Sequence, residues 1–459
     1  MRRRDERGVV LVVVLWLLVA ATALTLALGR ETKVEVGLSV ARADEVLLRA
    51  AADSLLERAK AELRLDETPY DTLFDPWRDD EARFAGAPVR ADGSVGEGLA
   101  ASDAAVVARA WLVLPEPDPG DGRELRFGIR DEASRLDVNL ATREQLAALP
   151  GITDEAIDAI LDWRDEDDDP EPLGAEAEVY AAKEPPYLPK NGFFESLHEL
   201  LRVEGVDAAM LYGEDRNRNG LLDPGEDDGD RSFPPDDADG LLDRGLIDYL
   251  TVVARDLDRT ADGRERLLWS QASPDQIEQR LREAGVSDAT AARLRTLKGM
   301  ASDAQSLGEI LGPLFAFGGP PDPSEVDAIV DEITAFAGQA VPGRINVNTA
   351  ATEVLAGLFE PEEVDAIVTA RLDPSRDLSS PAWLLEVVDP GRFAEVVDRV
   401  TVRSWQFTVQ GVVLLEGRPR LRRFEALLDR AYAPVRVLTW SDTTALGFPL
   451  PDERGEELP

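Results

Sequence analysis

The sequence predicts an α+β fold, in which a long N-terminal helix packs on a small antiparallel sheet and a large, mainly helical domain is inserted into that sheet. Three observations support this prediction. Residues 9–64 contain no proline and carry apolar residues at helical spacing. Alternating, strand-like segments lie at residues 104–132 and 405–440. Between them, residues 132–398 are predicted to be mainly helical.

The first element is an apolar run. Residues 9–28 contain no charge, and as a helix they would be about 30 Å long, which matches the hydrocarbon core of a bilayer. A secretory signal has a shorter apolar core of about 7 to 15 residues. Basic residues precede the run, at Arg2, Arg3, Arg4 and Arg7. The positive-inside rule therefore predicts a cytoplasmic N-terminus, with the rest of the chain beyond the membrane.

The same helix is predicted to continue as an amphipathic segment, residues 30–64. Its apolar residues recur at three- and four-residue spacing, at Val40, Ala43, Leu47, Ala51, Leu55, Ala59 and Leu63. A continuous helix from Val9 to about Arg64 would be roughly 80 Å long. We expect its first half to lie in lipid and its second half to pack on a head domain.

This N-terminus resembles that of type IV pilins and of the pseudopilins of type II secretion. A short basic leader, residues 1–8, ends in Gly8, and the apolar run, residues 9–29, follows at once. The resemblance implies that a prepilin peptidase cuts after Gly8 and that Val9 begins the mature chain; whether Val9 is N-methylated stays open. An ordinary signal anchor is the alternative for this segment, because hydropathy alone does not separate the two.

One departure from the pilin pattern is informative. Most pilin-like proteins carry a glutamate at the fifth residue after the cut, where this sequence has Val13. In a filament that glutamate would neutralise the amino terminus of the neighbouring subunit within lipid. A subunit without it cannot make this contact to a subunit above it, which suits the filament tip. Lack of the glutamate is a feature of the K-type minor pseudopilin.

The strand-like segments predict the head. Residues 104–114 and 124–132 read as a hairpin, and residues 405–417, 418–430 and 435–440 as further strands. One face of the first of these is apolar, with Phe407, Val409, Gly411, Val413 and Leu415. A pilin head is a sheet packed on a long helix. We therefore expect a pilin-like head, residues 65–131 and 399–459, interrupted by an insertion at residues 132–398.

The insertion contains an internal repeat. LDVNLATREQLAAL (136–149) matches INVNTAATEVLAGL (345–358), and a fainter copy begins at Arg266. Each copy reads as a strand-like entry, a capped helix, a tight turn and a second helix. This pattern resembles helix-hairpin-helix modules, whose turn amides can hold DNA phosphates. A membrane-anchored DNA receptor of the competence type is therefore an alternative function.

The charge of the chain opposes DNA binding. It has 90 acidic and 50 basic residues, a net charge of -40, and phosphate would meet like charge at the repeat turns. The acids around the two clearer turns are Asp154, Glu155, Asp158, Asp162, Glu360, Glu362, Glu363 and Asp365. We expect the repeats to serve packing and expect no nucleic-acid partner.

Few residues suited to catalysis are present. The chain has no cysteine and one histidine, His198, which rules out thiolate sites and schemes that need two imidazoles. Glu195 and His198 form a single E-x-x-H unit, whereas a di-carboxylate iron site needs two. There is no serine elbow motif. We expect a structural protein and no enzymatic activity.

Residues 158–203 carry the most specific family signal after the leader. A D-W-R-D segment, a G-A-E turn, a tyrosine and a P-K-N segment precede an S-L-x-E-L helix, and this order resembles the helical insertion of K-type minor pseudopilins. The resemblance implies a subunit that caps or initiates the pseudopilus of a type II secretion system. Its implied partners are the I-type and J-type minor pseudopilins, the major pseudopilin and prepilin peptidase. It implies an inner-membrane anchor and a periplasmic head.

A calcium loop is predicted at residues 215–226. The sequence DRNRNGLLDPGE places oxygen donors at the spacing of an EF-hand loop, with Gly220 at the sharp turn. The expected ligands are Asp215, Asn217, Asn219, the carbonyl of Leu221, Asp223 and Glu226. The two asparagines lower the ligand charge, which predicts a weak site of about 10⁻⁴ to 10⁻³ M. A solvated Asn/Asp/Gly loop is the alternative.

Two further acidic clusters are weaker candidates. The first is formed by Asp165, Asp167, Asp168, Asp169 and Glu176. The family resemblance makes calcium plausible there, because K-type pseudopilins hold calcium in their insertion, but a solvated charge run explains the cluster equally well. The weakest candidate is Asp256, Asp258 and Asp262.

Overall fold

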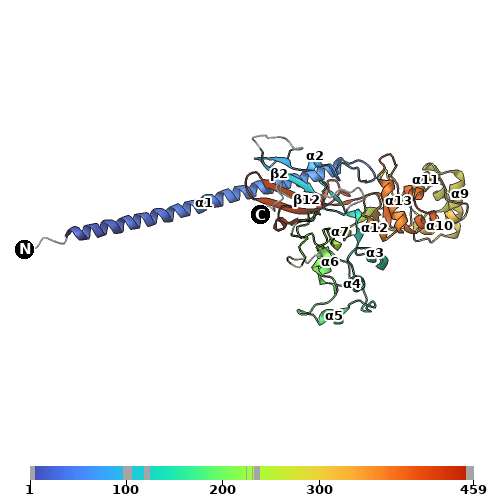
Figure 1. Ribbon diagram of the computed structural model, residues 1–459. Helices are drawn as coiled ribbons and strands as arrows, with labels where there is room; N and C mark the ends of the chain where they lie inside the picture. Colours follow the sequence, from blue (N-terminus) through green and yellow to red (C-terminus); the bar gives the residue numbers. More distant parts are fainter. Residues whose placement is uncertain are drawn as a thin grey trace, which may run out of the picture.

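The fold was analysed in a computed structural model that describes residues 6–96, 106–117, 125–223, 225–229, 231 and 238–450. Its first element, α1 (Glu6–Leu65), is a single helix of 60 residues. Figure 1 shows about half of α1 extending away from the head. The segment Val10–Leu65 is long and apolar enough to cross a membrane, and its most apolar window is not buried in the protein. The predicted continuous helix is therefore present.

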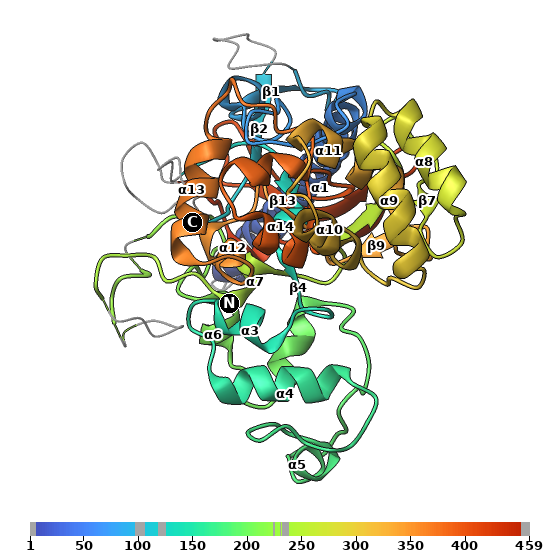
Figure 2. The same ribbon diagram turned by 90° about the vertical axis from the view of Figure 1, so that its right-hand side faces the viewer.

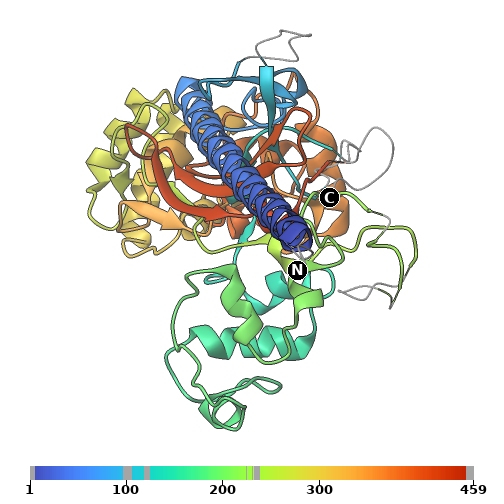
Figure 3. The ribbon, with the colours of Figure 1, turned by 90° about the vertical axis from the view of Figure 1, so that its left-hand side faces the viewer.

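The second half of α1 packs on the head, and Figure 3 shows it lying diagonally across the sheet. The buried side chains include Leu48, Ala51, Leu55 and Leu63. Val40, part of the predicted stripe, remains 44% exposed. Packing begins only at Asp44, because the helix reaches the edge of the sheet at this point.

The head sheet is antiparallel and joins segments that are far apart in sequence. Its order is β1 (Ala87–Arg90), β2 (Val106–Val113), β12 (Gln406–Leu415), β13 (Leu421–Asp429) and β14 (Arg436–Asp442). β2 pairs with β12 across the whole insertion, with Gly411 opposite Leu112. A mixed α+β fold with an insertion between two sheet strands is thereby confirmed.

The face of β12 that packs inside the head is the face that was predicted to be apolar. Phe407, Val409, Val413 and Leu415 are buried in one cluster with the apolar side of α1. At Gly411 a Cβ would overlap the ring of Phe424 on β13. The absence of a side chain at this position lets the Phe424 ring lie flat on the neighbouring strand.

The predicted hairpin after β2 is only partly formed. Val113 and Phe127 make an isolated bridge, and only β3 (Arg130–Asp131) continues as a strand, paired with the start of β12. On either side of this bridge, the amides of Leu114 and Gly128 donate to the carbonyls of Arg126 and Leu112, over 3.0 Å each. The amide of Ile129 donates to the carbonyl of Trp77. Short helices flank the sheet: α2 (Glu81–Phe84), η1 (Glu132–Ser134) and η4 (Thr444–Leu446).

The insertion consists of three successive units, which we call units 1, 2 and 3. Unit 1 comprises β4 (Leu136–Asp137), α3 (Arg143–Ala147), α4 (Asp154–Arg164), α5 (Ala177–Ala181), η2 (Leu197–Arg202), α6 (Ala208–Tyr212), α7 (Leu246–Tyr249) and β5 (Leu250–Thr251). Unit 2 comprises β7 (Leu267–Leu268), α8 (Pro274–Glu283), α9 (Asp288–Met300), α10 (Leu307–Ala316), α11 (Pro323–Glu332) and β8 (Ile333–Thr334). Unit 3 comprises β10 (Ile345–Asn346), α12 (Thr352–Ala356), α13 (Pro361–Arg371), η3 (Pro381–Glu386), α14 (Pro390–Val396) and β11 (Val400–Thr401). β6 (Arg255–Leu257) and β9 (Ala340–Pro342) pair antiparallel between the units.

The three units close in the same way. In each, the entry strand pairs in parallel with a two-residue strand that ends in threonine, as β4·β5, β7·β8 and β10·β11. The residue after each entry strand donates its amide to that threonine carbonyl, over 2.9, 2.7 and 3.1 Å. The repeat seen in sequence therefore extends to the end of each unit, beyond the two helices that carry the sequence match.

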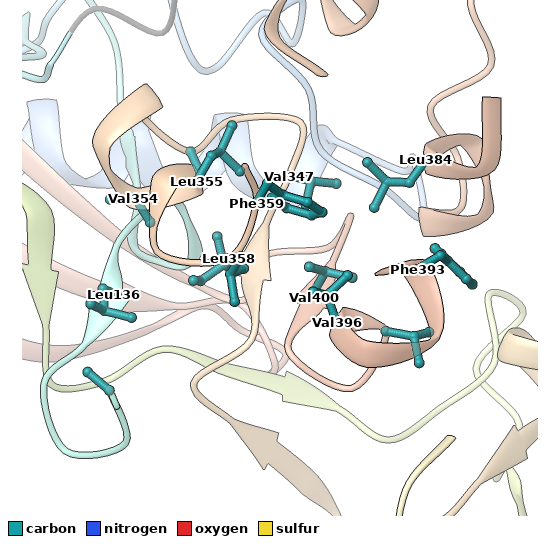
Figure 4. Close-up of a cluster of buried hydrophobic side chains, with 14 of the residues drawn as sticks. Leu136, Val347, Val354, Leu355, Leu358, Phe359, Leu384, Phe393, Val396 and Val400 are labelled. Carbon is teal, nitrogen blue, oxygen red and sulfur yellow. The ribbon is translucent and has the colours of Figure 1, made fainter. Parts of the chain in front are cut away.

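A basic side chain near the end of each second helix reinforces this closure. Arg164, Lys298 and Arg371 each donate to the carbonyl of the residue after their own entry strand. The units then merge into one apolar core. Figure 4 shows Leu136 of unit 1 near Val354 and Leu358 of unit 3.

Candidate metal-binding sites

The loop 215–226 lies between α6 and α7 of unit 1 and is docked on the sheet. The buried Arg423 of β13 donates to the carbonyls of Asn217 (2.6 Å) and Arg218 (2.7 Å). Asp215 and Glu226, at the two ends of the loop, are both buried, with 4% exposure. The head sheet therefore fixes the position of the loop.

Within this loop the predicted ligands take part in hydrogen bonds. Asp215 accepts amide hydrogen bonds from Asn219 (2.9 Å) and Gly220 (2.7 Å). Glu226 reaches back to accept from the amide of Asp223 (3.1 Å). Asn217 and Asn219 both donate to one carboxylate oxygen of Asp223, over 2.6 and 2.9 Å. The side chains are thus joined by hydrogen bonds within the loop, and their ligation of calcium stays a prediction. Gly220 has φ +77°, which supports the predicted sharp turn, since glycine adopts this conformation without strain.

The electrostatics of the loop favour a cation. Burial, together with the Asp248 carboxylate, raises the pKa of Asp215 to about 6. Burial, together with Asp215 and Asp223, raises the pKa of Glu226 to about 7. The Oδ1 of Asn217 is buried without a hydrogen-bond partner. An all-oxygen donor set with one unpaired oxygen fits calcium, and the Leu221 carbonyl remains the predicted main-chain ligand.

The second acidic cluster is more compact, but its members differ from those predicted. Ligand oxygens of Asp162, Asp165 and Glu176 all lie within 4.8 Å of one another. Asp162 is on the last turn of α4, and Glu176 immediately precedes α5 (Figure 2). The connecting loop passes very close to Asp162, because a Cβ at Gly174 would overlap its Oδ2.

The three carboxylates of this cluster lack a compensating cation. Asp162 Oδ2, Asp165 Oδ1 and both carboxylate oxygens of Glu176 are buried without hydrogen-bond partners. Burial, and then the charges of Asp162 and Asp165, raise the pKa of Glu176 to about 7. In the part of the chain that the structure describes, no lysine or arginine forms an ion pair with any of the three. Crowded, unpaired oxygens of this kind fit a divalent cation.

The structure corrects the predicted composition of this cluster. Asp167 instead accepts from the amide of Asp169, and Asp168 from Asn191. Asp162, on the last turn of α4 and three residues before the C-cap Asp165, is the candidate ligand that the prediction omitted. Its i,i+3 spacing to Asp165 was the available signal.

The prediction that Asp256, Asp258 and Asp262 form a metal site is wrong. Asp256 pairs with Arg344 over 3.1 Å, Asp258 with Arg266 over 3.4 Å, and Asp262 with Arg264 over 2.7 Å. Each carboxylate therefore has its own guanidinium partner. These positive charges would repel a metal ion.

His198 is exposed at the surface, in contact with neighbouring polar side chains. Its two ring nitrogens lie 3.2 Å from Ser196 Oγ and 3.4 Å from an Arg218 nitrogen. Burial and the Arg218 charge lower the pKa of His198. A neutral imidazole beside a guanidinium suits packing, and Glu195 makes an ion pair with Lys190 at 3.6 Å.

The turns of the repeats are poorly suited to bind a phosphate group. At the start of α9 the carboxylate of Glu325 accepts from the Ser287 amide (2.7 Å) and from the Thr290 hydroxyl (2.9 Å). A protein carboxylate thus already occupies the end of the helix that would hold a phosphate. At the unit 3 turn, Arg392 is paired with Glu360 and Glu363.

Three residues with predicted roles lie on α1. They are Gly8 and Val9, at the predicted cleavage site, and Val13, at the position where most pilins carry a glutamate. The helix begins at Glu6, so Gly8 and Val9 are helical. Val13 is 52% exposed on the part of the helix that extends from the head. An apolar side chain is therefore present on the helix surface where pilins carry their glutamate.

A comparison with known protein families agrees with the sequence-based assignment. Residues 134–212 match the family model described as type II secretion system (T2SS), protein K, which confirms the resemblance to K-type minor pseudopilins. A crystal structure of the GspK-GspI-GspJ complex from the type 2 secretion system of enterotoxigenic Escherichia coli is similar at 14% identity and a TM-score of 0.38. The similarity covers 90% of this chain and 98% of that one. No curated protein sequence matches the chain.

Proposed function

We propose that the chain is a minor pseudopilin that caps or initiates the pseudopilus of a type II protein secretion system. The observation that carries this proposal is the two-part helix α1. One half is apolar and free of the head, the other half is clamped on a sheet, and the family-matched segment belongs to the domain inserted in that sheet. No chemical reaction is needed, because assembly is the function.

In this proposal α1 associates with the helices of partner pseudopilins. The helix exposes apolar side chains for two turns beyond the predicted membrane span, including Val34 (61%), Val36 (58%) and Leu38 (52%). In water such a surface is unfavourable until other apolar surface covers it. The I-type and J-type minor pseudopilins and the major pseudopilin are the proposed partners.

The size and placement of the insertion support a position of this subunit at the tip of the pseudopilus. Units 2 and 3 lie at the end of the head opposite the free half of α1 (Figure 1). With α1 in the inner membrane and its N-terminus cytoplasmic, these units would be the most distant part in the periplasm. They would obstruct another subunit stacked above, and Val13 would offer no carboxylate to its amino terminus.

Calcium is proposed as a structural cofactor of unit 1. At one site it would join the end of α4 to the loop before α5 through Asp162, Asp165 and Glu176. At the other it would hold the loop 215–226 against the sheet. In both cases it would neutralise carboxylates that burial otherwise disfavours in their charged form.

Processing and partner binding test the proposal. The full chain, produced with and without prepilin peptidase, should differ by the mass of residues 1–8, and Gly8→Val should abolish that difference. The processed chain should also co-purify with the I-type and J-type minor pseudopilins. A chain that keeps Met1 beside an active peptidase, or that is recovered from solution beginning near Arg30, would contradict the assignment.

The alternative function, a DNA receptor of the competence type, is less well supported. The Glu325 carboxylate at the α9 turn and the acids at the other two turns oppose phosphate. Retention of labelled DNA by the full chain at physiological salt would restore it.

A further inference from the structure

We propose that a shallow groove on unit 2 binds an amphipathic helix of another protein, which presents apolar side chains on one face and a carboxylate beside them. The groove runs along α9 and has a volume of about 410 Å³. Its lining includes Ala292, Arg293, Thr296, Leu297, Met300 and Phe317.

Two residues of the groove are unusually exposed for their type. Met300 is 79% exposed and Phe317 is 75% exposed. Within the described residues these values exceed those of every other large apolar side chain, including those on the free half of α1. An apolar surface that a soluble head leaves uncovered marks a place for a partner. Methionine and phenylalanine also adapt well to an incoming apolar side chain.

Arg293 supplies the charge that defines the occupant. Its Nη2 donates to the carbonyls of Phe317 (2.7 Å) and Gly319 (3.0 Å), which holds Phe317 at the groove. Within the described residues the Arg293 guanidinium pairs with no carboxylate. The nearby Arg295, in contrast, pairs with Asp275 (2.9 Å) and Glu278 (3.0 Å). A guanidinium without a carboxylate partner at the edge of an apolar groove would attract a carboxylate from the occupant.

The shape of the groove suits a helix. The lining residues Ala292, Thr296 and Met300 follow one another at four-residue spacing along α9, so a second helix can pack its ridges alongside them. The helix α9, which carries most of the lining, lies at the end of the head opposite the free half of α1 (Figure 1). It would stay accessible while α1 is in a membrane. It also lies outside the family-matched residues 134–212.

A designed peptide tests this inference independently of the pseudopilin assignment. The probe is a dye-labelled, alanine-rich peptide of about 16 residues, long enough to form a helix, with leucines one turn apart and a glutamate between them. Its binding to the full chain in zwitterionic lipid nanodiscs is followed by fluorescence anisotropy, with empty nanodiscs subtracted. We expect saturable binding, about tenfold tighter than that of a matched peptide with lysine in place of glutamate.

Variants of the chain separate the charge from the apolar contribution. Thr296→Glu adds a carboxylate at an exposed position and should reverse the preference toward the lysine peptide. Met300→Gln should weaken both peptides about tenfold. Leu241→Gln alters a leucine of similar exposure, 68%, outside the groove and should change neither affinity. Equal binding of the two peptides, or a preference that survives Thr296→Glu, would overturn the proposal.

Discussion

Arg430 and Asp71 form a buried ion pair in which one guanidinium nitrogen lies 2.7 and 2.6 Å from the two carboxylate oxygens. Asp71 lies in the loop that follows α1, and Arg430 follows β13. The amide of Ser404 also donates to Asp71, over 2.7 Å. The pair thus ties the end of α1 to the strand region that closes the insertion.

Loss of this pair should destabilise the head. Asp71→Asn removes the carboxylate charge and leaves the buried Arg430 with Asp66 alone, which should cost about 3 kcal/mol, the low end for a broken buried pair. Urea unfolding of the full chain in detergent, followed by tryptophan fluorescence, measures this change. Glu67→Gln, at an exposed neighbouring position, should stay within about 0.5 kcal/mol of the parent. Equal stability of the two variants would show that the pair contributes nothing.

Gly174→Ala should abolish calcium binding at the Asp162 cluster. The added Cβ would overlap Asp162 Oδ2, so either this carboxylate or the loop leading to Glu176 must move. Isothermal titration of the full chain should then show one class of calcium site fewer than in the parent. Gly192→Ala is the matched control, because the nearest atom to its Cβ would be 3.9 Å away. Unchanged titration of Gly174→Ala would remove the cluster from the list of metal sites.

Without metal, the protein should become less stable as the pH rises. The folded-state pKa of Glu176 and of Glu226 is about 7, above the ordinary value of a glutamate. The native state therefore holds more protons than the unfolded state between about pH 4.5 and 7, and stability falls as the pH rises through this window. Thermal unfolding in chelator should give a higher midpoint at pH 5.5 than at pH 7.5.

Saturating calcium should weaken or reverse that dependence, because the metal binds the deprotonated carboxylates. Glu176→Gln together with Glu226→Gln should make the pH dependence in chelator less steep, and the remaining slope comes from other buried carboxylates with raised pKa values, such as Asp71 and Asp137. A chelated protein that gains stability from pH 5.5 to 7.5 would contradict the proposed crowding of carboxylates.

Arg371 should be essential to the closure of unit 3. Its Nη1 donates to the buried carbonyls of Val347 (3.1 Å) and Ala350 (2.6 Å). Arg371→Met leaves both without this donor, at a cost of about 3 kcal/mol. Arg392→Met, which removes only partly exposed ion pairs, should cost less than about 1 kcal/mol. Similar urea midpoints for the two variants would argue against a structural role for this contact.

Local patterns account for the parts of the fold that the sequence predicted well. The apolar face of β12 could be read from alternation, since Phe407, Val409 and Val413 must all point to one side of a strand. Burial of Ala51 and Leu55 followed from helical spacing in the same way. The spacing did not show that Val40 would stay exposed, because the start of packing depends on where the edge of the sheet meets the helix.

The two candidate metal sites also differ in how far local sequence patterns could predict them. The loop 215–226 is contiguous, so its oxygen-bearing side chains follow one another around the turn at Gly220, and the sequence was sufficient to propose them as ligands. The other cluster joins Asp162 on α4 to Glu176 across a folded-back loop. Its membership could not be read from sequence spacing, and Asp167 and Asp168, although adjacent in the sequence, lie outside it.

The sequence by itself determined the continuous helix α1, the longer strands β2, β12, β13 and β14 of the head, the position of the insertion and its repeated design, because each depends on periodicity or on matching residues. Tertiary structure alone decided that β2 pairs with β12, that each unit closes on its own threonine strand, and which carboxylates meet without a counter-charge. These features depend on contacts between distant segments, which are fixed by the packing of the whole chain around its core.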